Sequence, residues 1–308
     1  QIMIKIYTDY AAELAGFKNK ELDIMDWCLD PVDFQWFEAN DPDHSQYSTA
    51  FYAEFGLFEY DTQDQVLPTS IVSFRRAISH MLDKDYFINV NLPNAGAKAD
   101  SPIASITGWY NPALTDLYNL QPRTTMLPIP DDPQDWLAAY NLLVADLGSP
   151  IPDPESPGYY TWTWSSPFPT QDPMHLIGPV PNGHLLVFAR SDSSLRCPYL
   201  GNLLKDCCET ALPAMPAALG LVPGLGAKIH VDLYNVPRSI TSKVVMQEYW
   251  FHYYTGGWSL NRDPDFLQYY TTGQIIKPLP NAHNYVCYSN PNYDAEVDAM
   301  MSPPNIGG

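Results

Sequence analysis

The sequence is poor in basic residues and has no long apolar run. Lys and Arg together number 16 against 35 Asp and Glu, which gives a formal net charge of −19 over 308 residues. An acidic field without a basic stripe repels phosphate backbones, so nucleic-acid binding is not expected. No segment approaches the ~18 consecutive apolar residues of a membrane helix. We therefore expect neither a nucleic-acid interface nor a membrane-spanning helix.

Metal-binding and disulfide patterns are also missing. The five cysteines include no Cys-x-x-Cys pair, and the seven histidines include no His-Glu-x-x-His. The acidic runs lack the glycine and terminal glutamate of a calcium loop. Cys197 and Cys207 are expected on one helix, where ten residues span ~15 Å, too far for a disulfide. We expect no cofactor and no metal site. The histidines are expected to be structural or solvated, and any disulfides are expected to join distant segments.

Catalytic signatures are absent as well. The chain has no Gly-x-Ser-x-Gly elbow, P-loop or Gly-x-Gly-x-x-Gly. Its most glycine-rich stretch, "GLVPGLGAK" at 220–228, lacks the Gly-Lys-Ser/Thr ending of a phosphate loop and is better explained as a turn. Thirty-five acids form many carboxylate pairs by chance, so none is singled out as a glycosidase pair. We predict that the protein is not an enzyme.

Hydrophobic periodicity predicts an α/β protein. Ile2, Ile4 and Ile6 alternate as in a strand, 8–22 has helical character, and 22–25 is short and apolar. This order predicts a strand-helix-strand unit. Because the chain begins on Gln1 with a strand-like pattern, we expect it to be part of a longer protein.

The rest of the chain continues the α/β pattern. Helices are predicted at 69–87, 133–147, 199–212, 239–247 and 290–301. Strands at 184–190 and 227–236 flank the helix at 199–212, which predicts a parallel crossover. The proline-rich segment 149–183 predicts an irregular packed loop. A buried strand is predicted at 250–254, ended by Gly256 and Gly257.

Several segments resemble, in order, the family 5 extracellular solute-binding proteins. They are "SFRRAISHMLDKDYF", "LLVFARSDSSLRCPYLGNLL", "YYTGGWSLNRDPDF" and "NYVCYSNPNYDAEVDAM". The resemblance implies the periplasmic-binding-protein-like two-lobe α/β fold (cluster C type), here mostly lobe II. It further implies that residues 1–57 are the end of lobe I and that 58–308 are lobe II, with the loop at 149–183.

The same resemblance implies the ligand-binding residues. Arg190 matches an arginine that pairs with a ligand carboxylate in peptide-binding members, and an ion pair with Asp192 is the alternative. Trp258 matches a tryptophan that lines the pocket. Asn261 stands where peptide binders carry an aspartate for the ligand ammonium, and Asp263 is a neighbouring acid that could compensate. The predicted site is therefore Arg190, Asp192, Trp258, Asn261 and Asp263.

The function implied is that of the extracytoplasmic solute-binding component of an ABC importer. It would bind a peptide or other small solute between two lobes by hinge closure, with the transporter permease subunits as partners. Its expected location is periplasmic or cell-surface, anchored through a segment outside these residues if anchored at all. The alternative is a cell-surface structural protein that self-assembles on the same fold.

Overall fold

The computed structural model describes most of the chain. Within the described part, no helix is long and apolar enough to cross a membrane. The described residues are 3–7, 9–25, 29–41, 55–92, 96, 102–103, 109, 133–173, 175–192, 196–218, 226–260, 264–275 and 283–302.

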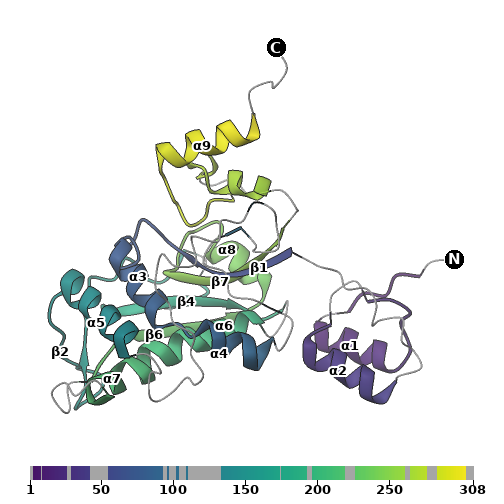
Figure 1. Cartoon of the computed structure of the whole chain (residues 1–308), viewed down its shortest axis with the longest axis horizontal. Helices are drawn as coiled ribbons and strands as arrows, with labels where there is room; N and C mark the ends of the chain where they lie inside the picture. The colour runs from purple at the N-terminus through teal and green to yellow at the C-terminus, as the bar shows by residue number, and fades with distance from the viewer. Residues whose placement is uncertain are drawn as a thin grey trace.

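The N-terminal segment forms two helices, α1 (Tyr10–Lys18) and α2 (Pro31–Asn40), drawn beside the larger α/β body in Figure 1. Phe17 and Phe37 pack with ring centroids 5.2 Å apart. The predicted strands are wrong within the described residues, because 3–7 and 22–25 contain none. Their isoleucines are exposed and no described strand pairs with them, and alternation alone does not supply a pairing partner.

The body is built on a four-stranded sheet. Its strands are β1 (Phe55–Thr62), β4 (His184–Arg190), β6 (His230–Val236) and β7 (Tyr253–Leu260), in the order β1-β7-β4-β6. Strand β4 runs parallel to β6 and β7, whereas β1 is antiparallel to β7. The predicted parallel crossover between β4 and β6 is confirmed, and the predicted boundary between residues 57 and 58 lies inside β1.

Helices cover the sheet on one face, as Figure 1 shows. Their packing joins buried side chains such as Phe74, Leu143 and Leu204 with Leu185 and Val187 of the central strand. The helices described in this part of the chain are α3 (Val72–Met81), α4 (Lys84–Asn91), α5 (Pro133–Leu147), α6 (Arg196–Asp206) and α7 (Leu212–Ala218). A π-helical turn, Cys207–Ala211, joins the last two.

The helix predicted at 69–87 is two helices. The chain leaves helical geometry at Leu82 and Asp83, and the Asp83 carboxylate accepts a bond from the backbone N–H of Tyr86, 2.7 Å away. Asp83 is thus an N-cap, a role for which aspartate is well suited. The sequence did not reveal the break, because α3 and α4 both bury apolar side chains and the spacing of these residues continues across Leu82 and Asp83.

The opposite face of the sheet packs against irregular segments and short helices. Leu186 and Phe188 of β4 belong to a second core cluster together with Phe251, Tyr254 and Tyr285. The elements here are α8 (Arg238–Val244), two 3-10 turns (Pro264–Tyr270 and Thr272–Gln274) and α9 (Pro291–Met301). The helix predicted at 290–301 is confirmed, and Asn290 caps it, since its side-chain oxygen accepts from the backbone N–H of Asn292, 3.0 Å away.

The proline-rich loop is more regular than predicted. It contains β2 (Ile151–Pro152) and β3 (Tyr160–Thr161), which form a small sheet with β5 (Ala227–Lys228). Trp162 is buried, and its indole N–H donates to the carbonyl of Gly148 over 2.9 Å. The strand predicted at 227–236 is accordingly split, with β5 in this small sheet and β6 in the main one.

The two glycines predicted to end a strand lie inside one. Strand β7 begins at Tyr253 and continues through Gly256 and Gly257 to Leu260, paired with β1 throughout. A Cβ on Gly256 would lie 2.8 Å from Cε1 of Tyr254 and 3.1 Å from Oδ2 of Asp61. Glycine is therefore required here for close packing within the sheet rather than for a turn.

The buried acid Asp61 makes stability depend on pH. Its Oδ2 accepts a bond from the hydroxyl of Tyr285 over 2.8 Å. Burial raises the pKa of Asp61 from 3.8 to about 7, despite the opposing hydrogen bonds of Tyr285 and Glu59. Between pH 3.8 and about 7 the folded state holds a proton that the unfolded state releases, so the contribution of Asp61 to stability is fully present at low pH and is lost as pH rises through this window.

We predict that Asp61→Asn removes this dependence. Relative to the variant, the unfolding free energy of the wild type should fall between about pH 4 and 7, by at most ~1.4 kcal/mol per pH unit. Denaturant titrations at several pH values measure it. Parallel curves for the two proteins would show that Asp61 keeps an ordinary pKa.

Gly201 of α6 sets how closely this helix approaches the sheet. A Cβ there would lie 2.9 Å from both the Cβ of Ala189 and the Cδ1 of Leu233. We predict that Gly201→Ala destabilises the protein by about 1–3 kcal/mol, because overpacking outweighs the better helix propensity of alanine. Gly273→Ala is the matched control, since no atom lies within 4 Å of the added Cβ. Equal thermal midpoints for both variants would contradict the prediction.

Candidate functional site

The parallel strands β4, β6 and β7 end at one edge of the sheet, here called the carboxyl edge. Arg190, the last residue of β4, pairs in register with Val236, the last residue of β6. On the other side Ala189 pairs with Thr255, so β7 passes this level and continues to Leu260. In open α/β sheets, ligands bind outside the carboxyl ends of the strands.

Arg190 and Asp192 are together at this edge, as an ion pair. The Nε of Arg190 donates to Oδ1 of Asp192 over 3.2 Å, and Oδ2 of Asp192 accepts from the backbone N–H of Arg238 over 2.9 Å. Asp192 therefore orients Arg190 and also holds the first turn of α8. The contact occupies Nε, whereas a guanidinium carries four further N–H donors on its terminal nitrogens. Such a fork suits a ligand carboxylate.

The remaining predicted residues follow along β7. Trp258 lies in the strand, opposite Leu57 of β1, directly after the glycine pair. Asn261 and Asp263 lie outside the described residues. The structure thus brings Arg190, Asp192 and the backbone of Trp258 to the same edge, and the ligand contacts of all five residues stay predictions.

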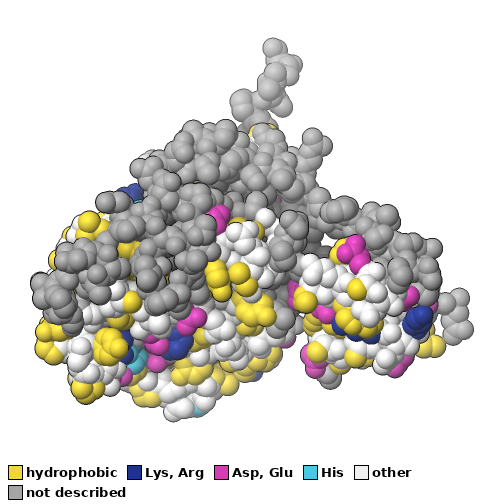
Figure 2. All heavy atoms as spheres, turned by 60° about the horizontal axis from the view of Figure 1, so that its bottom comes forward, with side chains coloured by type: hydrophobic (Ala, Val, Ile, Leu, Met, Phe, Trp, Pro, Cys, Tyr) yellow, Lys and Arg dark blue, Asp and Glu magenta, His cyan; other side chains and the backbone are white. Residues whose placement is uncertain are grey.

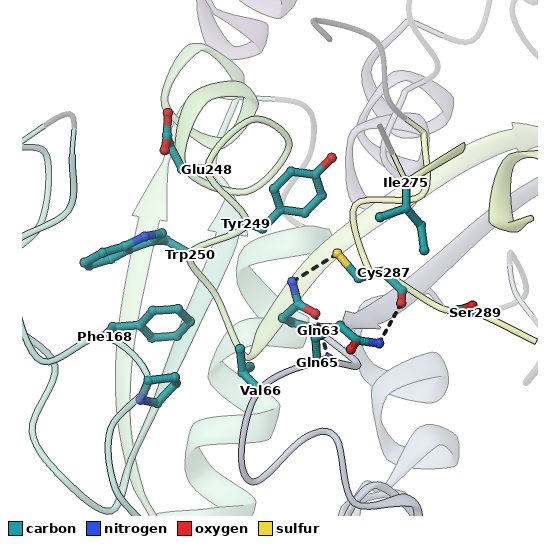
Figure 3. A pocket seen from close by; sticks show the side chains of 11 residues that line it. Gln63, Gln65, Val66, Phe168, Glu248, Tyr249, Trp250, Ile275, Cys287 and Ser289 are labelled. Carbon is teal, nitrogen blue, oxygen red and sulfur yellow. Dashed lines mark hydrogen bonds between the residues drawn. The ribbon is translucent and has the colours of Figure 1, made fainter. Parts of the chain in front are cut away.

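A pocket of about 510 Å³ lies at the opposite end of β7 (Figure 3). We call it the amino-end pocket. Its walls come from the segment after β1, the segment before β7, the proline-rich loop and the C-terminal part. Cys287 joins two of these, because Gln63 Nε2 donates to its sulfur over 3.4 Å and Gln65 Nε2 to its carbonyl over 3.1 Å. Other lining residues include Val66, Phe168, Glu248, Tyr249, Trp250, Ile275 and Ser289.

Two residues of this pocket have unusual backbone geometry. Tyr249 and Cys287 both have φ of 59°, in the left-handed region that side chains other than glycine seldom adopt. Phe168 and Trp250 pack with ring centroids 5.1 Å apart at 30°. The pocket thus offers aromatic surface and neutral amides. Sequence reasoning missed it, because its residues come from four separated segments and share no motif.

Two titratable groups in the core, His252 and Cys208, are held in uncharged forms. Burial lowers the pKa of His252 to about 3, and its ring is bonded on both sides: Nδ1 accepts from the N–H of Leu186 and Nε2 donates to the carbonyl of Leu67. Burial likewise raises the pKa of the Cys208 thiol well above its usual value. His252 is structural, as predicted, and the described cysteines Cys207, Cys208 and Cys287 are buried and not in disulfides.

Basic side chains do not form a patch on the face seen in Figure 2. Among the side chains described there, Lys and Arg are scattered and lie next to acidic or hydrophobic groups. On this face the described side chains therefore offer no basic patch of the kind that a phosphate backbone requires.

The fold of the chain is similar to that of binding proteins of known structure. Three solved structures show the likeness. The Escherichia coli murein tripeptide binding protein MppA matches with TM-score 0.57 and 16% identity, over 96% of this chain and 44% of that one. The Bacillus subtilis oligopeptide-binding protein AppA, in complex with a nonapeptide, matches with TM-score 0.56 and 12% identity, over 97% and 48%.

The third is NikZ from Campylobacter jejuni in complex with Ni(L-His), with TM-score 0.55 and 15% identity, over 98% of this chain and 49% of that one. The chain therefore spans about half the length of each. No protein-family model matches the sequence, and no curated protein matches it either. At these identities the likeness shows the fold, and it confirms the predicted periplasmic-binding-protein-like class.

We predict that Asp192→Ala lowers the unfolding free energy of the protein. The change removes the acceptor of the Arg238 N–H and the partner of Arg190, and should cost about 0.5–2 kcal/mol of unfolding free energy. Asp192→Asn keeps an oxygen acceptor and should cost less. Denaturant midpoints measure the difference. An alanine variant as stable as the wild type would show that the contacts of Asp192 do not stabilise the fold.

Proposed function

We propose that the protein is the solute-binding component of an ABC importer and works outside the cytoplasmic membrane. The observation that carries this proposal is the position of Arg190 at the carboxyl edge of a sheet with the solute-binding fold. The similar proteins AppA and MppA are peptide-binding by their descriptions. A binding role needs no catalytic pair, which agrees with the absence of catalytic motifs in the sequence.

The proposed solute is a peptide or other small molecule that carries a carboxylate. Asp192 holds the Nε of Arg190, and the terminal N–H groups of a guanidinium held in this way can make a bidentate contact with a carboxylate. Trp258 would supply an aromatic face. Asn261 has no formal charge and cannot form an ion pair with a free ammonium. We therefore propose that recognition centres on the carboxylate end of the solute, with neutral contacts elsewhere.

The solute would be enclosed by hinge closure between two lobes. We propose that the residues before β1 belong to the end of lobe I and that β1 and the residues after it belong to lobe II, a small change from the boundary between 57 and 58 expected from the sequence. Strand β1 pairs with β7 along all eight residues from Phe55 to Thr62, which favours a boundary just before Phe55. Closure would bring lobe I over the carboxyl edge, and permease subunits would then receive the solute.

Native mass spectrometry of protein purified from its source tests the proposal. A co-purified small molecule with a carboxylate is the expected result. The competing function is surface assembly, and a concentration-dependent polymer with no bound solute would support it and overturn the transport role.

We predict that Arg190→Ala weakens binding of the co-purified solute about 10- to 100-fold, because a charge-assisted contact contributes roughly 1.5–3 kcal/mol. Trp258→Ala should also lower affinity and leave the fold intact. Arg76→Ala, which removes an exposed arginine of α3, is the control. Calorimetry on the full-length protein measures all three. Arg190→Ala with the affinity of the control would remove Arg190 from the site.

A further inference from the structure

Two histidines start the neighbouring strands β4 and β6. His184 and His230 are in register on these parallel strands, and their rings stack with centroids 4.7 Å apart at 8°. Both rings thus lie on the same face, at the end of the sheet opposite Arg190. His184 is buried and His230 partly buried.

Carboxylates meet the nitrogens of both rings. The Nδ1 of His184 lies 3.2 Å from both oxygens of Asp232, and its Nε2 lies 3.1 Å from Oε1 of Glu155. The Nε2 of His230 lies 3.0 Å from Oδ2 of Asp153. A histidine that binds a metal usually donates its other ring N–H to a carboxylate, which fixes the tautomer and the ring orientation. Asp232 stands in that relation to His184.

Three donors are close enough to share one ion. One ligand atom each from Glu155, His184 and His230 lies within 4.8 Å of the others. Bonds of ~2.0–2.1 Å in a tetrahedral site place ligand atoms about 3.4 Å apart, so donors up to 4.8 Å apart must approach by as much as ~1.4 Å. Oε1 of Glu155 is already 3.1 Å from Nε2 of His184, so this movement falls to His230, whose ring must turn out of its stack with His184 to face the ion. The side chain of Glu155 is 50% exposed and can follow. Asp153 is held in place: its side chain is fully buried, and Oδ1 accepts from the Glu155 N–H over 2.8 Å.

The local charge favours a divalent cation. Three carboxylates, those of Asp153, Glu155 and Asp232, surround the two rings, and the nearby ammonium is that of Lys228, 3.5 Å from Asp153. With neutral imidazoles, these groups sum to an excess of two negative charges. Imidazole with carboxylate suits zinc and similar transition metals, whereas calcium and magnesium prefer oxygen ligands alone.

We propose that Glu155, His184 and His230 bind a divalent transition-metal ion of the zinc class, with Asp232 and Asp153 orienting the ligands. The ion would tie the segment between β2 and β3 to the amino ends of β4 and β6. Strand β4 has seven residues, which span ~20 Å, so this site is separate from the carboxyl edge. The bound metal is structural, and the proposal does not depend on the proposed transport role.

Zinc calorimetry on the untagged full-length chain tests the proposal. Zinc chloride alone should bind with a stoichiometry of one. Glu155→Gln should weaken this binding at least 10-fold, and His184→Gln and His230→Gln should abolish it. The control is His175→Asn, which changes an exposed histidine with φ of 58° to a residue that tolerates this geometry.

A second readout separates metal binding from folding. Zinc should slow amide hydrogen exchange in residues 153–161 of the wild type and of His175→Asn. It should have no such effect in Glu155→Gln, whose exposed side chain can change without loss of the fold. Zinc binding that persists equally in the glutamine variants would overturn the proposal. So would a folded wild type that binds no zinc, which would leave the cluster as ion pairs of a protonated His184.

Discussion

The central strand β4 has no solvated face, and the rest of the structure depends on covering it. His184 to Ala189 are all buried, with Leu185 and Val187 packed toward one core cluster and Leu186 and Phe188 toward the other. Parallel strands require crossover connections, and these must lie over the faces of the sheet. The helix run α6 to α7 is the connection from β4 to β6, and it supplies much of the first cluster.

Parallel pairing also separates the two ends of the sheet. All three parallel strands point their carboxyl ends to the edge that carries Arg190, and their amino ends to the edge near the paired histidines. A solute bound at the first edge is thereby kept apart from the metal proposed at the second. The amino-end pocket lies beyond the start of β7, so it too is separate from the carboxyl edge.

Sequence patterns predicted those elements whose signal is local. The strand at 184–190 and the helices at 133–147 and 290–301 follow from short-range pattern and chain geometry. The placement of Arg190 at a strand end was likewise predictable. The two strands predicted near the N-terminus are absent from the described residues there, because the alternation of Ile4 and Ile6 does not provide a partner strand.

The rest depended on contacts between distant segments. Gly256 looks like a turn residue in the sequence, and only the packing of Tyr254 and Asp61 against it shows why a strand needs glycine there. The grouping of Glu155, His184 and His230 has no motif, because register between β4 and β6 brings the histidines together. Residue spacing in the sequence predicts neither feature.

We propose that solute binds at the carboxyl edge of the parallel strands. Hydrogen exchange on protein purified with its solute, compared with the same protein after the solute is removed by unfolding and refolding, tests it most directly. The account predicts slower exchange in the bound form at residues 188–192 and 255–260. Protection confined to 63–66 and 248–250, around the amino-end pocket, would contradict it.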